Sequence, residues 1–186
     1  MESKLQIISG TYRGRKLFLP TGARPTQNLA RGAVFNMLGG ILSPNDKMFV
    51  WDAFAGSGAL GIETLSRYPN ATGVFTDAAP ESVRVIRKNL DGFSQKHTIE
   101  QIDATHAIKK YAADADVIFV DPPYDMAETG IKFVEKLAKS VRPGTLVVQE
   151  IETKVNYTPD EMGWNVLRDK RYGRARFVIL QRKVDK

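Results

Sequence analysis

The sequence contains no cysteine and only two histidines among its 186 residues. The absence of cysteine excludes disulfides, thiolate metal sites and a cysteine nucleophile, and it fits a reducing compartment. The histidines, His97 and His106, lack the spacing of metal ligands, so no metal is expected. No apolar run approaches the length of a membrane span, and the first residues do not resemble a signal peptide. We therefore expect a cytoplasmic protein that contacts no membrane, and we expect it to be a monomer.

Acidic residues are scarce at the two ends of the chain. Residues 1–31 carry six Lys or Arg against one Glu, and residues 168–186 carry eight against two Asp. The net charge of the whole chain is only +6, so the middle is acidic. Basic segments release counterions when they neutralise phosphates, so this distribution indicates a polyanionic partner. Lysine and arginine that merely solubilise a surface would give the same charge count.

After the first 44 residues, apolar runs alternate with helical patterns, which predicts a parallel sheet with helices on both faces. Strands are predicted at 48–51, 72–76, 97–102, 117–120 and 146–148, with helices around 58–67, 80–90, 104–111 and 127–139. The C-terminal part of the sequence has a different hydrophobic pattern. Residues 164–167 and 176–180 are predicted as strands joined through Asp169–Gly173, an antiparallel pair. The expected fold is therefore α/β, with a mostly parallel sheet of seven strands.

The N-terminal part follows another pattern and ends at a cluster of helix-breaking residues. Residues 7–19 predict two short strands around a glycine-containing turn, which would form a small β-hairpin. Arg24-Pro25-Thr26 then leads into a helix that the Thr26 hydroxyl can cap. We therefore divide the chain into an N-terminal hairpin-and-helix extension, 1–44, and a main domain, 45–186.

The tetrapeptide Asp121-Pro122-Pro123-Tyr124 directly follows the predicted strand 117–120. The two prolines fix φ and remove two backbone donors, so the carbonyls that precede them face outward. A carboxylate, carbonyl oxygens and an aromatic ring then converge at the end of a strand, where they can hold a flat base that carries an amino group. Taken alone, the tetrapeptide is equally well explained as an Asp-Pro turn followed by a packed tyrosine.

A glycine-rich loop, 52–61, follows the first strand of the alternating region and opens a helix, which is the context of a nucleotide-binding loop. Gly56 and Gly58 allow a tight turn and a close approach to a ligand. Asp77 ends the next strand, 19 residues beyond Gly58, and can accept hydrogen bonds from both hydroxyls of a ribose. The third strand ends in Asp103-Ala104, in position to approach an adenine edge.

Four consecutive strands thus deliver polar groups to the carboxyl edge of the sheet, where open α/β sheets bind ligands. The loop lacks the lysine of a P-loop, so a ligand with an adenosine and no diphosphate fits best. The spacing to the tetrapeptide indicates S-adenosylmethionine, with S-adenosylhomocysteine as product, rather than a nicotinamide dinucleotide. The candidate cofactor-binding residues are Asp52, Phe54, Ala55, Gly56, Gly58, Asp77, Asp103 and Ala104.

With these residues identified, the chain resembles the bacterial 16S ribosomal RNA guanine-N2 methyltransferases of the RsmD type over nearly its whole length. Many amino-methyltransferases share the tetrapeptide, whereas the basic N-terminal pattern joined to Arg24-Pro25-Thr26 is far more specific. The other matching segments are Ile7–Gly10, Arg13–Leu17, Arg31, Phe35–Leu38, Asp52–Gly61, Glu63, Leu65–Arg67, Asn89-Leu90 and Asp103-Ala104. Two positions depart from the family: Asp77 replaces the usual Glu, and Gly32 stands where an acidic residue often follows the arginine.

The resemblance implies a Rossmann-like class I methyltransferase fold, S-adenosylmethionine as methyl donor and one guanine of 16S rRNA as target, position 966 in the usual rRNA numbering. It also implies action on a partly assembled small ribosomal subunit. Asp121 and the Pro122 carbonyl would hold the guanine amine, and Tyr124 would stack on the base. The residues expected to hold RNA phosphates are Arg13, Arg15, Lys16, Arg24 and Arg31. Phe54 can also be explained by packing of the loop. Glu63 can also be explained as a negative charge that the helix dipole favours near the start of a helix.

Other functions remain open at this point. Adenine-N6 DNA methyltransferases use the same tetrapeptide, but they need a target-recognition region, for which the N-terminal extension looks too small. A non-catalytic RNA-binding or assembly factor would have a degenerate loop or turn, and neither is degenerate here. A protein amide methyltransferase would leave the basic ends unexplained.

Overall fold

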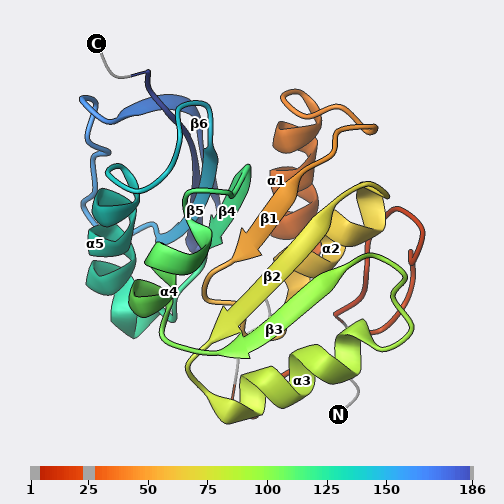
Figure 1. Cartoon of the computed structure of the whole chain (residues 1–186). Coiled ribbons are helices and arrows are strands. Elements are labelled where there is room, and N and C mark those ends of the chain that lie inside the picture. Colours follow the sequence, from red (N-terminus) through yellow and green to blue (C-terminus); the bar gives the residue numbers. More distant parts are fainter. Residues whose placement is uncertain (1–4, 23–27, 185–186) are drawn as a thin grey trace.

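The computed structural model describes residues 5–22 and 28–184 and shows a sheet between two layers of helices (Figure 1). The helices are α1 (Asn28–Gly39), α2 (Ala59–Arg67), α3 (Pro80–Leu90), α4 (Ala104–Tyr111) and α5 (Ala127–Leu137), with a 3₁₀ helix, η1 (Tyr124–Met126). The strands are β1 (Phe49–Asp52), β2 (Thr72–Asp77), β3 (His97–Gln101), β4 (Val117–Val120), β5 (Leu146–Glu152), β6 (Trp164–Tyr172) and β7 (Ala175–Arg182). In the described part of the chain, no helix is long and apolar enough to cross a membrane.

The seven strands form one sheet in the order β3-β2-β1-β4-β5-β7-β6. Strands β1 to β5 pair in parallel, and β7 runs antiparallel to both β5 and β6. The predicted fold class is therefore confirmed. The chain winds outward from β1 in one direction and from β4 in the other, and such a switch point leaves a crevice at the carboxyl ends of the strands.

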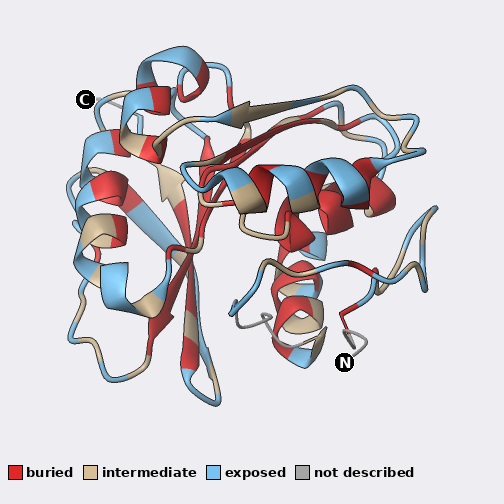
Figure 2. Cartoon of the chain, turned by 90° about the horizontal axis from the view of Figure 1, so that it is seen from below, coloured by how far each residue is buried: buried red, intermediate tan, exposed pale blue. Residues whose placement is uncertain are grey.

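Successive strand residues point into two cores, one on each face of the sheet. Phe75 and Phe119 pack with buried residues of α1, α2 and α3. Trp51 and Ile118 pack with buried residues of α4 and α5 on the opposite face. Figure 2 shows the buried residues running along the strands and along the inner sides of the helices. Because both faces are covered, the central strands are apolar at nearly every position, which is why they were recognisable from the sequence.

The N-terminal segment, residues 5–22, lies on the face that carries α2 and α3. The predicted hairpin is confirmed only in part: one antiparallel bridge joins Gln6 and Lys16, flanked by backbone hydrogen bonds of 2.9 Å, but residues 5–22 form no regular strands. The backbone N–H groups of Ile8 and Ser9 donate to the Glu63 carboxylate at 2.8 and 3.0 Å, so they are not available to extend a ladder. Tertiary hydrogen bonds thus limit the strand pairing that the local pattern suggested to a short hairpin.

Helix α1 begins at Asn28, while Arg24-Pro25-Thr26, with the proposed cap, lies outside the described residues. The helix ends at Gly39, because the two consecutive glycines at 39 and 40 favour the unfolded backbone. Val34 and Phe35 of α1 share one core with residues of the sheet and of the N-terminal segment. The division of the chain at residue 44 therefore stays a prediction.

The C-terminal strands are longer than expected. The predicted connection through Asp169–Gly173 is wrong, because β6 continues to Tyr172 and β7 begins at Ala175. The turn needs only two residues, and Gly173 supplies the positive φ of 59°. Strand β6 lies at the edge of the sheet with one neighbour, so its charged side chains remain in solvent and do not prevent strand formation.

Candidate active site

Three aspartates meet at the carboxyl edge of the central strands. Asp52 ends β1, Asp77 ends β2, and Asp121 follows β4. Burial raises the pKa of Asp52 to about 7, with further contributions from the negative charges of Asp121 and Asp77, while the Gly61 N–H opposes the shift. The structure therefore brings these three predicted site residues together around the switch point between β1 and β4.

The loop after β1 has the shape expected of a ligand-binding loop. Gly56 and Gly58 have φ of 55° and 78°, a region that L residues rarely adopt. Asp52 Oδ2 accepts a hydrogen bond from the Gly61 N–H at 2.9 Å, and Asp77 Oδ2 accepts one from the Gly56 N–H at 2.8 Å. These bonds fix the loop and direct the amino end of α2 toward the crevice.

The remaining loop candidates have contacts within the protein. The Phe54 ring packs edge-on against Phe133 with centroids 5.2 Å apart, which agrees with a packing role. The Ala55 N–H donates to the Thr76 carbonyl at 3.0 Å, which joins the loop to β2. Both residues position backbone around the crevice, and contact of either with a cofactor stays a prediction.

Asp103 lies at the amino end of α4, which it caps. Its carboxylate accepts hydrogen bonds from the Thr105 hydroxyl and, at 2.8 Å, from the Thr105 N–H. These hydrogen bonds hold the pKa of Asp103 below its usual value. Ala104, the first residue of α4, is buried. The predicted adenine contact would therefore be made by the accessible part of the segment that follows β3, beside the capping carboxylate of Asp103.

The tetrapeptide after β4 forms a turn that continues into η1. The Pro123 carbonyl accepts a hydrogen bond from the Met126 N–H at 2.8 Å. Within the described residues, no group donates to the Pro122 carbonyl. Gly130 of α5 approaches Pro122 so closely that a Cβ there would lie 2.7 Å from the proline ring. The first turn of α5 thus supports the turn that carries Asp121 at the crevice.

Tyr124 is fixed at both its ring and its hydroxyl. The hydroxyl donates a hydrogen bond to Glu150 Oε1 at 2.9 Å, and the Arg174 guanidinium lies over the ring, 5.7 Å from its centroid. Burial, followed by the charge of Glu150, raises the pKa of Tyr124 well above its usual value. The phenol therefore stays neutral and serves as a positioned aromatic surface.

Glu150 is a site residue that the sequence reasoning missed. It lies in β5, is buried, and faces Asp121 and Tyr124. Burial, followed by the negative charge of Asp121, raises the pKa of Glu150 to about 9. Two adjacent carboxylates cannot both be charged without a large cost, so Glu150 is the protonated partner at neutral pH. A signal was present, because Glu150 interrupts a strand that is otherwise mostly apolar.

The Glu150→Gln variant should gain stability relative to the parent as pH rises. A raised native pKa means that the contribution of Glu150 to stability is complete below pH 4.5 and is lost as pH rises toward 9. Glutamine keeps the acceptor for Tyr124 and does not titrate. The difference in unfolding free energy between variant and parent should shift by on the order of 2 kcal/mol in favour of the variant between pH 5 and pH 8.5. Urea unfolding at both pH values measures it, and an equal difference at both would contradict the assignment.

Arg31 does not lie where a phosphate could reach it. Its side chain is fully buried, its guanidinium donates to the Gln6 carbonyl and to Asn28, and its Nε lies 3.6 Å from Glu63 Oε2. Burial lowers the pKa of Arg31, and the nearby Glu63 charge opposes this shift. The predicted RNA contact of Arg31 is therefore wrong: this arginine attaches α1 to the N-terminal segment and α2.

Glu63 joins the same cluster, so its explanation as a charge at a helix start is also wrong. It is the fifth residue of α2 and is fully buried. Besides the two N–H groups of the N-terminal segment, its Oε1 accepts a hydrogen bond from Arg67 Nε at 2.7 Å. Nearby, a Cβ on Gly10 would lie only 1.9 Å from the Ser66 carbonyl, which shows how closely the segment approaches α2.

The exposed basic residues of the N-terminal segment lie at the other edge of the sheet. Arg13 and Lys16 are exposed, and the Arg15 guanidinium lies 5.2 Å from the centroid of the Phe93 ring. Phe93 precedes β3, so this cluster stands beside the amino ends of the parallel strands. Arg24 lies outside the described residues. The phosphate contacts of Arg13, Arg15 and Lys16 stay a prediction, and they would engage RNA away from Asp121.

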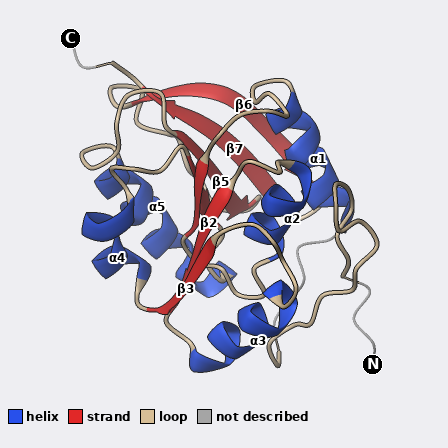
Figure 3. Ribbon diagram, turned by 45° about the vertical axis from the view of Figure 1, so that its right-hand side comes forward, coloured by secondary structure: helices blue, strands red, loops and turns tan. Residues whose placement is uncertain are grey.

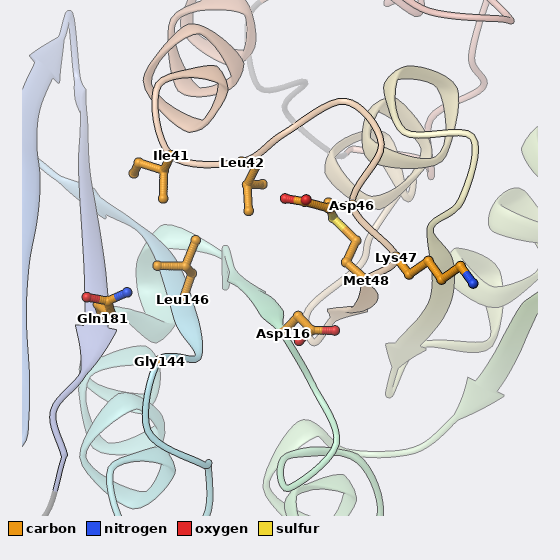
Figure 4. A pocket seen from close by; sticks show the side chains of 9 residues that line it. All are labelled: Ile41, Leu42, Asp46, Lys47, Met48, Asp116, Gly144, Leu146 and Gln181. Atoms are coloured by element: carbon orange, nitrogen blue, oxygen red, sulfur yellow. The ribbon is translucent and has the colours of Figure 1, made fainter.

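A hollow of about 330 Å³ opens at the amino edge as well (Figure 4). Its apolar wall includes Leu42, Met48 and Leu146, and its polar rim includes Asp46 and Asp116. None of the predicted site residues lines it. The described residues contain no group of three or more His, Asp or Glu side chains that could hold a metal ion. The crevice at the carboxyl edge is therefore the site to which the sequence and the geometry both lead.

Known proteins share both this sequence pattern and this architecture. The model of a family described as "Conserved hypothetical protein 95" matches residues 5–181. The "Ribosomal RNA small subunit methyltransferase D" of Escherichia coli (strain K12) is 30% identical over 187 residues, covering 97% of this chain and 91% of that protein. In Bacillus subtilis (strain 168), the "Putative rRNA methyltransferase YlbH" is 33% identical over 127 residues, covering 64% of this chain and 67% of that protein.

A solved structure described as a putative methyltransferase, yhhF, from Escherichia coli matches with a TM-score of 0.80 and 29% identity, covering 97% of this chain and 99% of that chain. An RNA methyltransferase from Salinibacter ruber, solved in complex with S-adenosyl-L-homocysteine, has a TM-score of 0.65 and covers 88% of this chain. Its identity is 20%, so it supports the fold alone.

Proposed function

The chain belongs to the RsmD-type family described as "Conserved hypothetical protein 95", a class I methyltransferase family, and we propose that it methylates the exocyclic N2 of a guanine in 16S ribosomal RNA. The methyl donor is S-adenosylmethionine and the product is S-adenosylhomocysteine. The observation that carries this proposal is the placement of the Asp121–Tyr124 turn beside the glycine loop, at the switch point between β1 and β4.

The residues around the crevice fit the proposed cofactor. Asp77 is oriented by the N–H groups of Gly56 and Ala79, both at 2.8 Å, and its remaining lone pairs can accept hydrogen bonds from ribose hydroxyls. A Cβ on Gly56 would meet nothing within 4 Å, so the loop leaves open space on that side. When bound, S-adenosylmethionine supplies an electrophilic methyl group. Asp52 and the loop would line its methionine end.

Asp121 and the Pro122 carbonyl would act on the amine that is methylated. The exocyclic amine of guanine is a weak nucleophile because its lone pair is delocalised into the ring. Acceptors on its two hydrogens raise the electron density on nitrogen and favour the pyramidal geometry of attack. After transfer the nitrogen is strongly acidic, so its proton can leave along the hydrogen bond to Asp121 and no histidine is required.

Tyr124 would bind the face of the target base. Its hydroxyl is engaged by Glu150 and one side of its ring lies under Arg174, so the other side is available for stacking. A base must leave its helical stack to reach this turn, and the cost is lowest in a single-stranded or distorted region. This agrees with the proposed action on a partly assembled small subunit. We further propose that the protein acts as a monomer in the cytoplasm and that residues 1–44 form an RNA-binding extension.

Purified protein should introduce N2-methylguanine into small ribosomal subunits isolated from a strain that lacks the enzyme. Nucleoside mass spectrometry after digestion identifies the product, and omission of S-adenosylmethionine provides the control. Naked 16S rRNA, tested in parallel, reports whether a partly assembled subunit is required. N6-methyladenine in DNA, or the absence of any methylated nucleoside, would overturn the assignment and favour a DNA methyltransferase or a non-catalytic RNA-binding factor.

A further inference from the structure

Strand β6 exposes a series of cations that no other part of the described chain neutralises. Arg168, Lys170 and Arg171 are exposed, and within the described residues none of them forms an ion pair. The one carboxylate among them, Asp169, is already paired with Arg176 of β7 at 2.7 Å. Strand β6, the outer strand of the sheet (Figure 3), therefore presents an excess of positive charge to solvent.

The register places two of these cations on the same face of the sheet as the active-site carboxyl of β5. Lys170 pairs with Phe177 of β7, and Phe177 pairs with Glu150 of β5. Side chains at paired positions point to the same face, so Lys170 shares a face with Glu150. Two strand spacings separate their backbones, which is roughly 10 Å. Arg168 lies two residues before Lys170 in β6, so it points to that face as well.

The turn between β6 and β7 lies beside the Asp121–Tyr124 turn, which we call the catalytic turn. Arg174 is the second residue of the β6–β7 turn, lies over the Tyr124 ring and forms an ion pair with Glu152, as Lys154 does at 2.9 Å. Glu152 thus has two cationic partners, and the side chains of Arg174 and Lys154 remain 63% and 76% exposed. Positive charge therefore continues from β6 to the rim of the proposed base-binding site.

The position of β6 distinguishes its charges from those of the N-terminal segment. Arg13 and Arg15 lie beside the amino ends of the strands, whereas the β6–β7 turn lies at the carboxyl edge, beside Tyr124. Nucleotides next to the target must pass close to Tyr124, and their phosphates need partners within a few ångströms. Among the described residues, the cations of the β6–β7 hairpin are placed to provide such partners.

We propose that the β6–β7 hairpin is an RNA-binding surface that holds the backbone phosphates next to the target nucleotide, through Arg168, Lys170 and Arg174. This inference rests on the proposed function, because it assumes an RNA substrate whose target base lies at Tyr124. Phosphate contacts contribute affinity by releasing counterions and carry no base specificity. The hairpin therefore sets the affinity and the register of the RNA, while the choice of base is made at the catalytic turn.

The test is a double variant, Arg168→Gln with Lys170→Gln, compared with a double variant of equal charge, Lys136→Gln with Lys139→Gln. The control lysines are exposed, and they lie at the carboxyl end of α5, at the amino edge of the sheet. Binding to 16S rRNA is measured by fluorescence anisotropy from 50 to 200 mM salt, and methyl transfer to small subunits is measured separately.

The β6 variant should bind RNA about 10-fold more weakly, with a salt dependence reduced by about two phosphate contacts, while the control changes neither. Its KM for small subunits should rise with little change in kcat, because the catalytic turn is intact. Equal effects in both double variants, or an unchanged salt slope in the β6 variant, would overturn the inference. So would self-association of the β6 variant without loss of RNA affinity, since it would show that the charges only protect the sheet edge.

The two proposals fail in different ways. If the parent protein binds 16S rRNA but transfers no methyl group to guanine, the proposed function fails, and the comparison of salt slopes still tests the hairpin. If the parent methylates small subunits and the β6 variant has the affinity and salt slope of the parent, only the hairpin surface is rejected. If the parent does not bind 16S rRNA at all, both proposals are rejected.

Discussion

Replacing Asp121 by alanine should reduce the rate of methyl transfer to small-subunit rRNA by at least ~10²-fold while leaving the affinity for S-adenosylmethionine nearly unchanged. The carboxylate of Asp121 is the group that would accept a hydrogen from the amine and orient its lone pair. The proposed donor contacts come from the loop after β1 and from the end of β2, which do not depend on this side chain. The loss should therefore appear in kcat.

Asp125 offers a matched control for Asp121. It lies four residues further along, in η1, is exposed, and forms no ion pair within the described residues. Asp125→Ala removes the same charge from the same turn and should keep turnover close to that of the parent. Single-turnover methylation and calorimetric titration with S-adenosylmethionine measure both quantities for both variants. Full turnover by the Asp121 variant would refute its role, and a parallel loss of cofactor binding would place Asp121 in the donor pocket instead.

Replacing Glu63 by alanine should destabilise the protein by about 3–5 kcal/mol, because it leaves the buried guanidinium of Arg31 without its counter-charge. The change also removes the acceptors for the N–H groups of Ile8 and Ser9. Unfolding in urea measures the loss of stability. Hydrogen exchange should show that the amides of residues 5–22 lose protection first, because Glu63 joins this segment to α2.

The Arg31→Met variant completes a double-mutant cycle with Glu63→Ala. Removing both charges should cost less than the sum of the single changes, because no unpaired charge then remains buried. Glu128→Ala is the surface control: Glu128 pairs with Lys132 at 2.7 Å, but both side chains are largely exposed. Its effect on stability should be far smaller than that of Glu63→Ala, because solvent screens an exposed ion pair. Additive single effects, or a loss below 1 kcal/mol for Glu63→Ala, would show that the buried pair is not coupled.

Much of the site was predictable because it is built from strand ends. Asp52, Asp77 and Asp121 follow apolar runs that are buried on both sides, and parallel strands carry such ends to one edge whatever the details of packing. Glu150 escaped because the strand was predicted only at 146–148, whereas β5 continues to Glu152 and includes Glu150. Only the packing of β4 against β5 places it beside Asp121.

Charged residues were the main source of error, because their type does not reveal their environment. Arg31 was assigned to phosphate binding from its place in a basic pattern, yet Glu63, distant in sequence, meets it inside the protein. Asp169–Gly173 was predicted as the connection between two strands, yet Asp169 to Tyr172 belong to an edge strand. For Arg31 a partner far along the chain decided the outcome, and for β6 the neighbouring strand β7 decided it by pairing along the whole strand.

The sequence by itself determined the order of strands and helices, the glycine loop, the aspartates at the strand ends and the family. These features depend on residue periodicity and on turn chemistry, which act over a few residues. The tertiary structure alone decided that Arg31 and Glu63 form a buried pair, that Glu150 is protonated beside Asp121, and that Arg174 of the β6–β7 turn lies over the Tyr124 ring. Burial, pKa and the distance between surfaces depend on segments that meet only after folding, so no local pattern encodes them.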